Sequence, residues 1–527
     1  MPRINRRRFL QLAGLAPFGA RAAFGEIWHE VGKLGGGEHS LRLLYTNDFH
    51  SAFEPIPAYW RPGSPPLGGA AYLATLVERQ RAAAGTTFLF DSGDMFTGTL
   101  SFLTRGEALM ELMTLMRYDA MGVGNHEFDY GWEIFDRQAT RVPFPVVCCN
   151  IRYKDSGRRF CRPYTLLERD GARLAVIGVI GLDARSVVLP SKVEELEFTD
   201  PVAEARACIE ILRDTVDLVV VLGHQGLPGP MQTDAENDPS VQRTIEADLQ
   251  FCGAVPGVDV YIGAHSHHGL EEPLVHPATG TLLVQTYGYG TRLGLLDLVV
   301  KNRKVVRHRG ELLEVRSADL PPHPGVAARV AHYRQVVAPE IGPPLGSAAA
   351  RFVRRYHHES PLGDFVADTI RERMACEVGI TNAGGLRADL PEGPIDRAHV
   401  LDALPFVNAT VALELLGRDL RETLEHGCSL ERGMVQISGI SARYDPKAPV
   451  GSRLREVQVG DRPLDPERVY RVATNSFLAE GGDRYQALLR GKETARTALI
   501  SEVVIDRIRA AGTITPAPLG RMVAAAT

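Results

Sequence analysis

The distribution of apolar residues along the chain predicts short buried strands that alternate with helices. Seven apolar runs, each followed by polar residues, have the length and composition of buried strands. They cover residues 41–45, 87–90, 120–123, 174–180, 218–222, 258–262 and 282–285. Apolar residues at helical spacing occur between them, for example within 109–116 and 205–212. This alternation predicts a layered α/β domain.

A second domain is predicted after a segment rich in proline and glycine. Residues 318–346 have this composition, and we interpret them as an interdomain linker that contains a helix at 326–337. Beyond the linker, helical spacing at 362–374 and 416–426 alternates with strand-like runs at 410–414 and 469–473. The sequence therefore predicts a first domain over residues 41–317 and a smaller, mixed α/β domain over 347–520.

The N-terminus has the features of an export signal. Residues 5–11, Asn-Arg-Arg-Arg-Phe-Leu-Gln, look like a twin-arginine signal, followed by an apolar run at 12–18 and an Ala-x-Ala site at 20–22. The run is shorter than the roughly 20 residues that span a bilayer, and no later segment reaches that length. We expect a twin-arginine signal peptide at 1–23, read by the export machinery, and a linker at 24–40. The predicted protein is periplasmic or otherwise exported, without a stable membrane span.

Composition and charge exclude some classes of partner. The chain has 527 residues, 44% of them hydrophobic, which is ordinary for a globular protein. Its net charge of −5 gives no global basic field, so we expect no nucleic-acid partner. The seven cysteines include no C-x-x-C pair, which favours buried thiols over a disulfide framework or a thiolate zinc site. Any bound anion must therefore be held locally, by metal ions or by arginines.

Five of the predicted strands are followed by residues of metal-ligand type. These residues are Asp48, His50, Asp94, Asn125, His224, His265 and His267. Because functional sites of α/β sheets assemble at the carboxyl ends of strands, we expect these side chains to lie together. Imidazole and carboxylate suit zinc, manganese or iron, and two such ions roughly 3.5–4 Å apart assist phosphoester hydrolysis. Each motif taken singly is also typical of a turn, a cap or a structural histidine, but five at strand ends favour a metal site.

The order of these motifs resembles that of the calcineurin-like metallophosphoesterases. The motifs are D-x-H, G-D, G-N-H-E, G-H and G-x-H-x-H, and residues 46–50 and 124–129 are similar to the 5′-nucleotidase branch. The resemblance implies a layered αββα first domain that holds two divalent metal ions, zinc, manganese or similar. It assigns one ion to Asp48, His50, Asp94 and His267, and the other to Asp94, Asn125, His224 and His265. It also makes His126 the catalytic histidine, oriented by Asp129.

The second half of the chain resembles the C-terminal, nucleotide-binding domain of the same family. Its motifs are N-x-G-G-x-R at 382–387, Pro-Phe at 405–406 and F-L-A-E-G-G-D at 477–483. The resemblance implies contacts to substrate from Asn382, Gly385, Arg387, Phe406, Phe477 and Asp483. Arg387 would bind phosphate, the two phenylalanines would stack on a base, and Asp483 would bind ribose hydroxyls. One position departs from the family, because Tyr356 stands where an arginine usually precedes the E-S-x-L-G motif.

These features predict an exported 5′-nucleotidase acting on a small-molecule nucleotide. Nucleoside monophosphates are the leading substrates, 2′,3′-cyclic nucleotides and UDP-sugars lie within the family's range, and the linker at 318–346 would be a hinge. One alternative is the thiosulfohydrolase branch of the superfamily, kept open by Tyr356 but disfavoured by the two phenylalanines. Another is a surface binding protein without catalysis, disfavoured because every ligand-type residue is present. The sequence predicts no oligomeric state.

Overall fold

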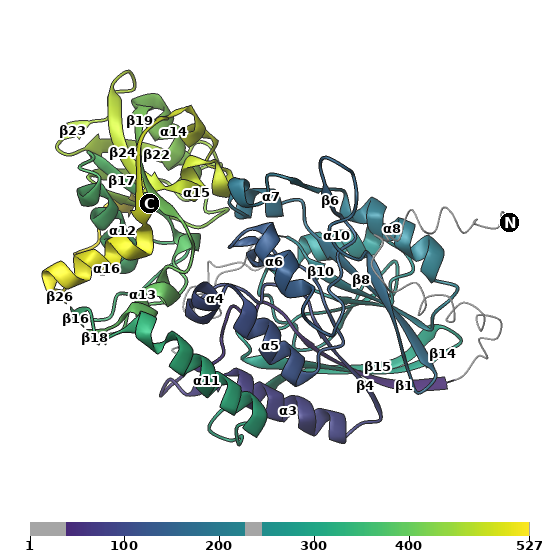
Figure 1. Cartoon of the computed structure of the whole chain (residues 1–527). Helices are drawn as coiled ribbons and strands as arrows, with labels where there is room; N and C mark the ends of the chain where they lie inside the picture. The colour runs from purple at the N-terminus through teal and green to yellow at the C-terminus, as the bar shows by residue number, and fades with distance from the viewer. Residues whose placement is uncertain (1–37, 59, 227–244, 526–527) are drawn as a thin grey trace.

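The computed structural model describes residues 38–58, 60–226 and 245–525, which form two α/β units (Figure 1). The first unit runs from the purple to the teal part of the chain, and the second from green to yellow. The predicted signal peptide at 1–23 and most of the linker at 24–40 lie outside the described residues. None of the described helices is both long and apolar enough to cross a membrane.

Two sheets pack face to face in the first unit. One sheet has the order β15-β14-β1-β4-β5 and the other β12-β13-β11-β10-β8-β7. The first contains β1 (Glu38–Thr46), β4 (Thr86–Asp91), β5 (Ala120–Met121), β14 (Arg292–Lys301) and β15 (Lys304–Glu314). The second contains β7 (Tyr164–Arg169), β8 (Ala172–Ile180), β10 (Leu218–His224), β11 (Val260–Ile262), β12 (Leu274–Val275) and β13 (Leu282–Val284). Leu43 and Phe88 of one sheet share a buried cluster with Val176 and Val220 of the other.

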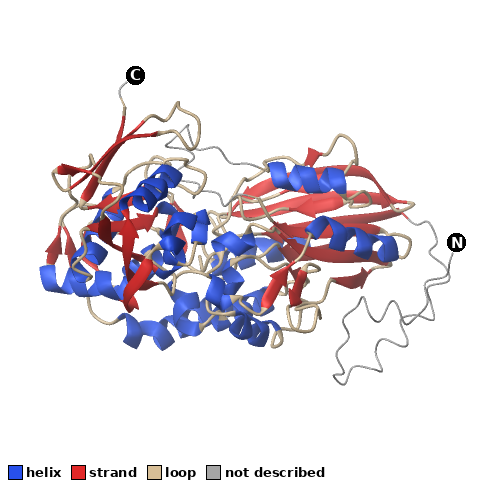
Figure 2. Ribbon diagram, turned by 90° about the horizontal axis from the view of Figure 1, so that it is seen from above, coloured by secondary structure: helices blue, strands red, loops and turns tan. Residues whose placement is uncertain are grey.

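Helices cover the outer face of each sheet, so the unit is the predicted αββα sandwich (Figure 2). On the first sheet lie α3 (Ala70–Ala82), α4 (Thr99–Thr104), α5 (Glu107–Met116) and α6 (Trp132–Ala139), and on the second α8 (Pro201–Leu212) and α10 (Glu246–Ala254). Strand residues alternate between the two faces, so Leu43 packs on the other sheet while Leu44 packs against helices. Burial on both faces explains why these strands are continuous apolar runs.

Each of the seven predicted strands of the first unit is present. Some are shorter than their apolar runs: β5 contains only two residues of the run at 120–123, because the chain then turns into the loop that carries Asn125. The remaining short elements are β2 (Pro55–Pro57), β3 (Pro66–Gly68), β6 (Ile151–Tyr153), β9 (Leu196–Phe198) and α7 (Ala184–Val187). All seven cysteines are free thiols, and six of them are buried.

The second unit is a smaller mixed α/β structure, as predicted. Its central sheet has the order β20-β17-β24-β19-β25, formed by β17 (Val378–Asn382), β19 (Ala409–Leu416), β20 (Val435–Ser438), β24 (Val469–Asn475) and β25 (Lys492–Leu499). Two further sheets contain β21 (Ile440–Tyr444), β22 (Leu454–Val459), β23 (Arg462–Pro463) and β27 (Met522–Ala524), and β16 (Gly346–Ala348), β18 (Gly393–Ile395) and β26 (Thr513–Ile514). The helices are α12 (Pro361–Arg373), α13 (Arg397–Ala403), α14 (Gly417–Gly427), α15 (Ser476–Ala479) and α16 (Ile500–Ala511).

A long helix lies at the junction between the units. Helix α11 (Pro324–Ile341) occupies most of the segment at 318–346 and packs on α3 and α5 of the first unit while it contacts α13 of the second. It begins with a proline in its first turn, and the side chain of His323 accepts a hydrogen bond from the Val326 amide. The linker is therefore largely helical; the domain boundaries and the hinge stay predictions.

Candidate active site

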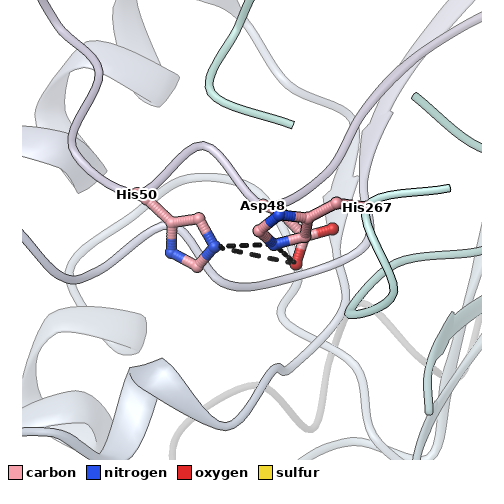
Figure 3. Close-up of side chains that lie close together, drawn as sticks. All are labelled: Asp48, His50 and His267. Carbon is pink, nitrogen blue, oxygen red and sulfur yellow. Dashed lines mark hydrogen bonds and ion pairs between the residues drawn. The ribbon is translucent and has the colours of Figure 1, made fainter. Parts of the chain in front are cut away.

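Three of the predicted ligand residues form a tight group beside β1. Asp48 and His50 follow β1, and His267 follows β11 in the other sheet. The Nε2 atoms of His50 and His267 are 3.1 Å apart, and His267 Nε2 lies 3.5 Å from Asp48 Oδ1 (Figure 3). All three side chains are buried and point toward one another.

A second group forms around His224 at the end of β10. Its Nε2 atom lies 3.2 Å from Asp94 Oδ2, from His265 Nδ1 and from Asn125 Oδ1. Asp94 also has ligand-type atoms of His50 and His126 close to its carboxylate, within 4.8 Å of one another. Asp94 therefore lies between the two groups, in the position of a shared ligand.

The chemistry and spacing of these atoms fit divalent cations. Two donors that are each about 2.1 Å from one tetrahedral ion lie roughly 3.4 Å apart, which matches the separations within each group. Carboxylates, neutral imidazoles and an amide oxygen form a mixed oxygen and nitrogen donor set that suits divalent ions and has no excess negative charge. The seven side chains predicted from the sequence are thus brought together in two groups that suit two ions.

The backbone at these residues is held in an uncommon conformation. Five of the seven have positive φ angles: Asp48 50°, His50 46°, Asp94 59°, His265 68° and His267 51°. Left-handed backbone at residues other than glycine costs of order 1–3 kcal/mol each and persists where the surrounding structure enforces it. The loop at 124–125 can lie this close to Asp94 because position 124 is a glycine. A Cβ atom at Gly124 would lie 2.2 Å from Asp94 Oδ1.

Two carboxylates that support the ligands were not predicted. Asp183, in the loop after β8, places Oδ2 3.0 Å from Nε2 of His265. Glu127 accepts hydrogen bonds from the amides of Asp94, Met95 and Gly124, which joins two ligand loops. Asp183 follows the predicted strand at 174–180, as the ligand-type residues follow theirs, so its position in the sequence could have indicated a role in the site. Nothing in the sequence indicates the contacts of Glu127.

His126 lies beside Asp94 and His50, and its imidazole contacts Asp129. Its Nδ1 atom lies 3.1 Å from Asp129 Oδ1, and Thr97 donates a hydrogen bond to the other oxygen of that carboxylate. Burial lowers the pKa of His126, but the charges of Asp129 and Asp94 outweigh burial and raise the pKa overall. The nearby carboxylates thus favour a protonated imidazole.

A cavity between the two units brings the predicted substrate-binding residues to the metal-ligand side chains. Its lining includes Asn125, His126 and Asp129 from the first unit and Tyr356, Asn382, Gly385, Arg387, Phe406, Phe477 and Asp483 from the second. Asn382 donates a hydrogen bond of 2.7 Å to Asp483. Nη2 of Arg387 lies 3.2 Å from the Tyr289 hydroxyl and 3.4 Å from His50 Nε2. Arg387 therefore reaches the first ligand group from the second unit, and Tyr289 is a contact that the sequence did not indicate.

The two phenylalanines line this cavity but differ in their surroundings. Phe406 stacks on the imidazole of His126, with ring centres 5.5 Å apart and planes 19° apart. Phe477 is 8% exposed and packs against Gly482, where a Cβ atom would come within 2.3 Å of the ring. Phe406 thus connects the nucleotide-binding motifs to the predicted catalytic histidine.

An αββα sandwich with buried histidine–carboxylate groups at its strand ends is the arrangement that the metallophosphoesterase resemblance implies. Family models agree: residues 41–269 match the calcineurin-like phosphoesterases, and residues 341–490 match the 5′-nucleotidase C-terminal domain. The chain belongs to the 5′-nucleotidase family of metal-dependent phosphoesterases, as the resemblance implied.

Relatives of known name match most of the chain. The chain is 28% identical to snake venom 5′-nucleotidase of Naja atra, over 92% of this chain and 99% of that one. It is 26% identical to endonuclease YhcR of Bacillus subtilis over 89% of this chain, but it spans only 39% of that longer protein. The crystal structure of a 5′-nucleotidase precursor from Thermus thermophilus matches with a TM-score of 0.82 and 28% identity, over 92% of this chain and 99% of that one.

Proposed function

We propose that this protein is an exported two-metal phosphohydrolase that releases phosphate from nucleoside monophosphates. The observation that carries the proposal is the cavity between the units, lined by Phe477 and Asp483 together with Asn125 and His126. A nucleotide has an apolar base, a polar ribose and an anionic phosphate. The same cavity offers an aromatic ring, a carboxylate and a metal-ligand group, which is the set of partners that such a molecule requires.

Two divalent ions, zinc or manganese, fit the donor groups. Asp48, His50 and His267 would hold the first ion, Asn125, His224 and His265 the second, and Asp94 would bridge them. When bound, such ions polarise phosphoryl oxygens and lower the pKa of water to give a nucleophile near neutral pH.

Side chains of the cavity would bind and orient the phosphate. Among the described residues, the buried Nε atom of Arg387 has no hydrogen-bond partner, while its Nη2 atom contacts Tyr289 and His50. The guanidinium is therefore placed to bind phosphate oxygens beside His50. His126 is held through Nδ1 by Asp129, so its Nε2 atom remains for the oxygen of the leaving nucleoside. A protonated His126 would donate a hydrogen bond there as negative charge develops.

The second unit would hold the rest of the nucleotide. Phe406 and Phe477 would stack on the base, an interaction worth about 1–3 kcal/mol that tolerates any base. Asp483, fixed by Asn382 at 2.7 Å, would accept hydrogen bonds from the ribose hydroxyls. The aromatic lining favours a nucleotide over the sulfur group of a carrier protein, which needs no ring to stack on.

Hydrolysis assays on the purified chain test the proposal. The protein is loaded with manganese or zinc, and phosphate release is measured from AMP, a 2′,3′-cyclic nucleotide and a UDP-sugar. We expect chelator-sensitive hydrolysis of AMP that Arg387→Ala strongly reduces. Hydrolysis of an aryl phosphate without hydrolysis of any nucleotide would contradict the nucleotide assignment. No hydrolysis with either metal would contradict catalysis altogether.

Export through the twin-arginine route has a separate test. The arginines at positions 6 and 7 are replaced by lysine in the full-length chain, and the protein is located by cell fractionation. We expect the wild-type chain in the exported fraction and the double variant retained inside the cell. Equal export of both would contradict a twin-arginine signal.

A further inference from the structure

Tyr289 connects the first ligand group to an arginine of the second unit. It lies in the loop between β13 and β14 and is 8% exposed. Its ring centre lies 5.1 Å from that of His50 and 5.5 Å from that of His267, both in the first ligand group. Its hydroxyl accepts a hydrogen bond of 3.2 Å from Nη2 of Arg387. One side chain therefore contacts two predicted metal ligands and the arginine that we propose to bind phosphate.

The backbone holds Tyr289 in an uncommon conformation. Its φ angle is 54°, and the flanking glycines, Gly288 and Gly290, have φ angles of 87° and 59°. Left-handed backbone is readily adopted by glycine but is strained at a tyrosine. The Tyr289 amide donates a hydrogen bond of 2.7 Å to the carbonyl oxygen of Asp48, which ties this conformation to the loop of the first ligand group. Such strain is concentrated at functional sites, which points to a task for the side chain at 289.

Nη2 of Arg387 contacts two side chains of the first unit, and only one of the contacts is compatible with a bound metal ion. Nη2 lies 3.4 Å from His50 Nε2 and 3.2 Å from the Tyr289 hydroxyl. His50 Nε2 also faces Nε2 of His267 at 3.1 Å, so it is the atom that would bind an ion. A ring nitrogen that binds an ion has no lone pair left to accept a hydrogen bond. Among the described residues, Tyr289 is then the acceptor that remains for Nη2.

The bond to Tyr289 restricts the orientation of the whole guanidinium. The group is planar, so holding Nη2 limits the directions in which Nε–H and the other N–H groups can point. The buried Nε atom of Arg387 has no hydrogen-bond partner among the described residues, and Arg387 lines the cavity between the units. An arginine that is already oriented loses less conformational entropy when it binds phosphate.

We infer that Tyr289 is a positioning residue, whose hydroxyl orients Arg387 toward the phosphate of the substrate. The inference rests on the proposed function, because it assumes that Arg387 binds that phosphate. Tyr289 acts through Arg387 and needs no contact of its own with the substrate. Its ring makes separate contacts with His50 and His267, so a variant that lacks only the hydroxyl separates the two sets of contacts.

The test compares kcat/KM of the metal-loaded wild type and of Tyr289→Phe, which keeps the ring and removes the hydroxyl. We expect kcat/KM for AMP and for a small aryl phosphate to fall by the same factor, about 10-fold. The two losses should be equal because both substrates present a phosphate to Arg387. A fall for AMP alone would place the role at the nucleoside and overturn the inference. Unchanged kcat/KM for both substrates would also overturn it.

A double-mutant cycle tests whether Tyr289 acts through Arg387. In the Arg387→Ala background, Tyr289→Phe should have no further effect on kcat/KM for the aryl phosphate, because no guanidinium is left to orient. A tyrosine that acts only by packing on the ligands would cause the same loss in both backgrounds, and that result would overturn the inference.

Metal affinity gives a second readout, measured by competition with a chromogenic chelator. Both affinities should be unchanged in Tyr289→Phe, because the ring still packs on His50 and His267. Weaker binding of either ion would assign the loss of activity to the ligand group and overturn the inference.

Tyr287→Phe is the matched control, since it removes a tyrosine hydroxyl from the same loop. That hydroxyl donates a hydrogen bond of 2.9 Å to Glu271. We expect kcat/KM for both substrates to stay near the wild-type values. An equal fall in Tyr287→Phe and Tyr289→Phe would show a general effect on the loop and overturn the inference.

Failure of the proposed function remains distinguishable from failure of the positioning role. If the wild type hydrolyses the aryl phosphate but no nucleotide, the nucleotidase assignment fails, and the aryl phosphate alone tests Tyr289→Phe. If it hydrolyses neither, binding of inorganic phosphate to the metal-loaded protein is measured by calorimetry. The affinity for phosphate should be weaker in Tyr289→Phe than in the wild type, and equal affinities would overturn the inference.

Discussion

The contact between Asp183 and His265 provides a quantitative test of the proposed second metal site. His265 directs Nδ1 toward His224 and the second ligand group, while its Nε2 lies 3.0 Å from Asp183 Oδ2. A neutral histidine that binds an ion through Nδ1 carries its proton on Nε2, and Asp183 is placed to accept that proton's hydrogen bond. Asp183→Ala removes this acceptor and leaves a buried N–H group without a partner.

The size of the effect follows from the burial and charge of this pair. The side chain of His265 is 4% exposed and that of Asp183 14% exposed, so water screens the interaction little. A hydrogen bond to a charged group is worth about 1.5–3 kcal/mol, which corresponds to about 10- to 150-fold in affinity. Loss of a carboxylate behind a histidine ligand typically weakens metal binding about 10- to 100-fold. Asp183→Asn keeps an oxygen acceptor without the charge, and its loss should be smaller.

Competition with a chromogenic chelator measures both metal affinities and the stoichiometry. We expect Asp183→Ala to weaken the binding of one of the two ions and to leave the other near its wild-type affinity, because Asp183 contacts His265 of the second group. Asp214→Ala is the matched control, since Asp214 is 98% exposed and pairs with Arg303 at 3.6 Å. Wild-type affinity for both ions in Asp183→Ala would refute the assignment of His265 as a ligand through Nδ1.

Three further predictions concern the shared ligand, the base site and a buried acid. Asp94→Asn should reduce phosphate release to background, because Asp94 lies between both ligand groups; near-normal turnover would exclude it from the site. Phe477→Ala should raise KM for AMP by about 5- to 150-fold, from a stacking energy of about 1–3 kcal/mol, and spare a small aryl phosphate. Equal losses for both substrates would mean that Phe477 acts only in packing. Burial raises the pKa of Asp364 to about 8, so the folded chain keeps a proton that the unfolded chain releases above about pH 4. The stability of the wild type relative to Asp364→Asn should therefore fall from pH 4 to 8 in urea denaturation; a constant difference would contradict a protonated Asp364.

The fold and the grouping of the ligand-type residues could be predicted because their signals are local. Strands that are buried on both faces are apolar at nearly every position, so the apolar runs at 174–180 and 218–222 can be recognised as strands from the sequence. Asp48 lies just after β1 and His224 at the end of β10, and strand ends converge in space. Asp183 also follows a strand, β8, but an aspartate in a loop can have many roles. Its partner His265 is 82 residues away in the sequence, so their contact could not be predicted from local signals.

Contacts between distant segments required the tertiary structure. Arg387 reaches His50 across 337 residues, and Arg432 reaches Ser186 across 246 residues, only because the second unit packs on the strand ends of the first. No periodicity or motif in the sequence predicts how the two units pack against each other. The sequence alone determined the two α/β units, the family and the set of ligand-type residues, because each depends on neighbours along the chain. The tertiary structure decided which side chains share a cavity and which buried charges lack a partner, because those depend on how two separately folded surfaces meet.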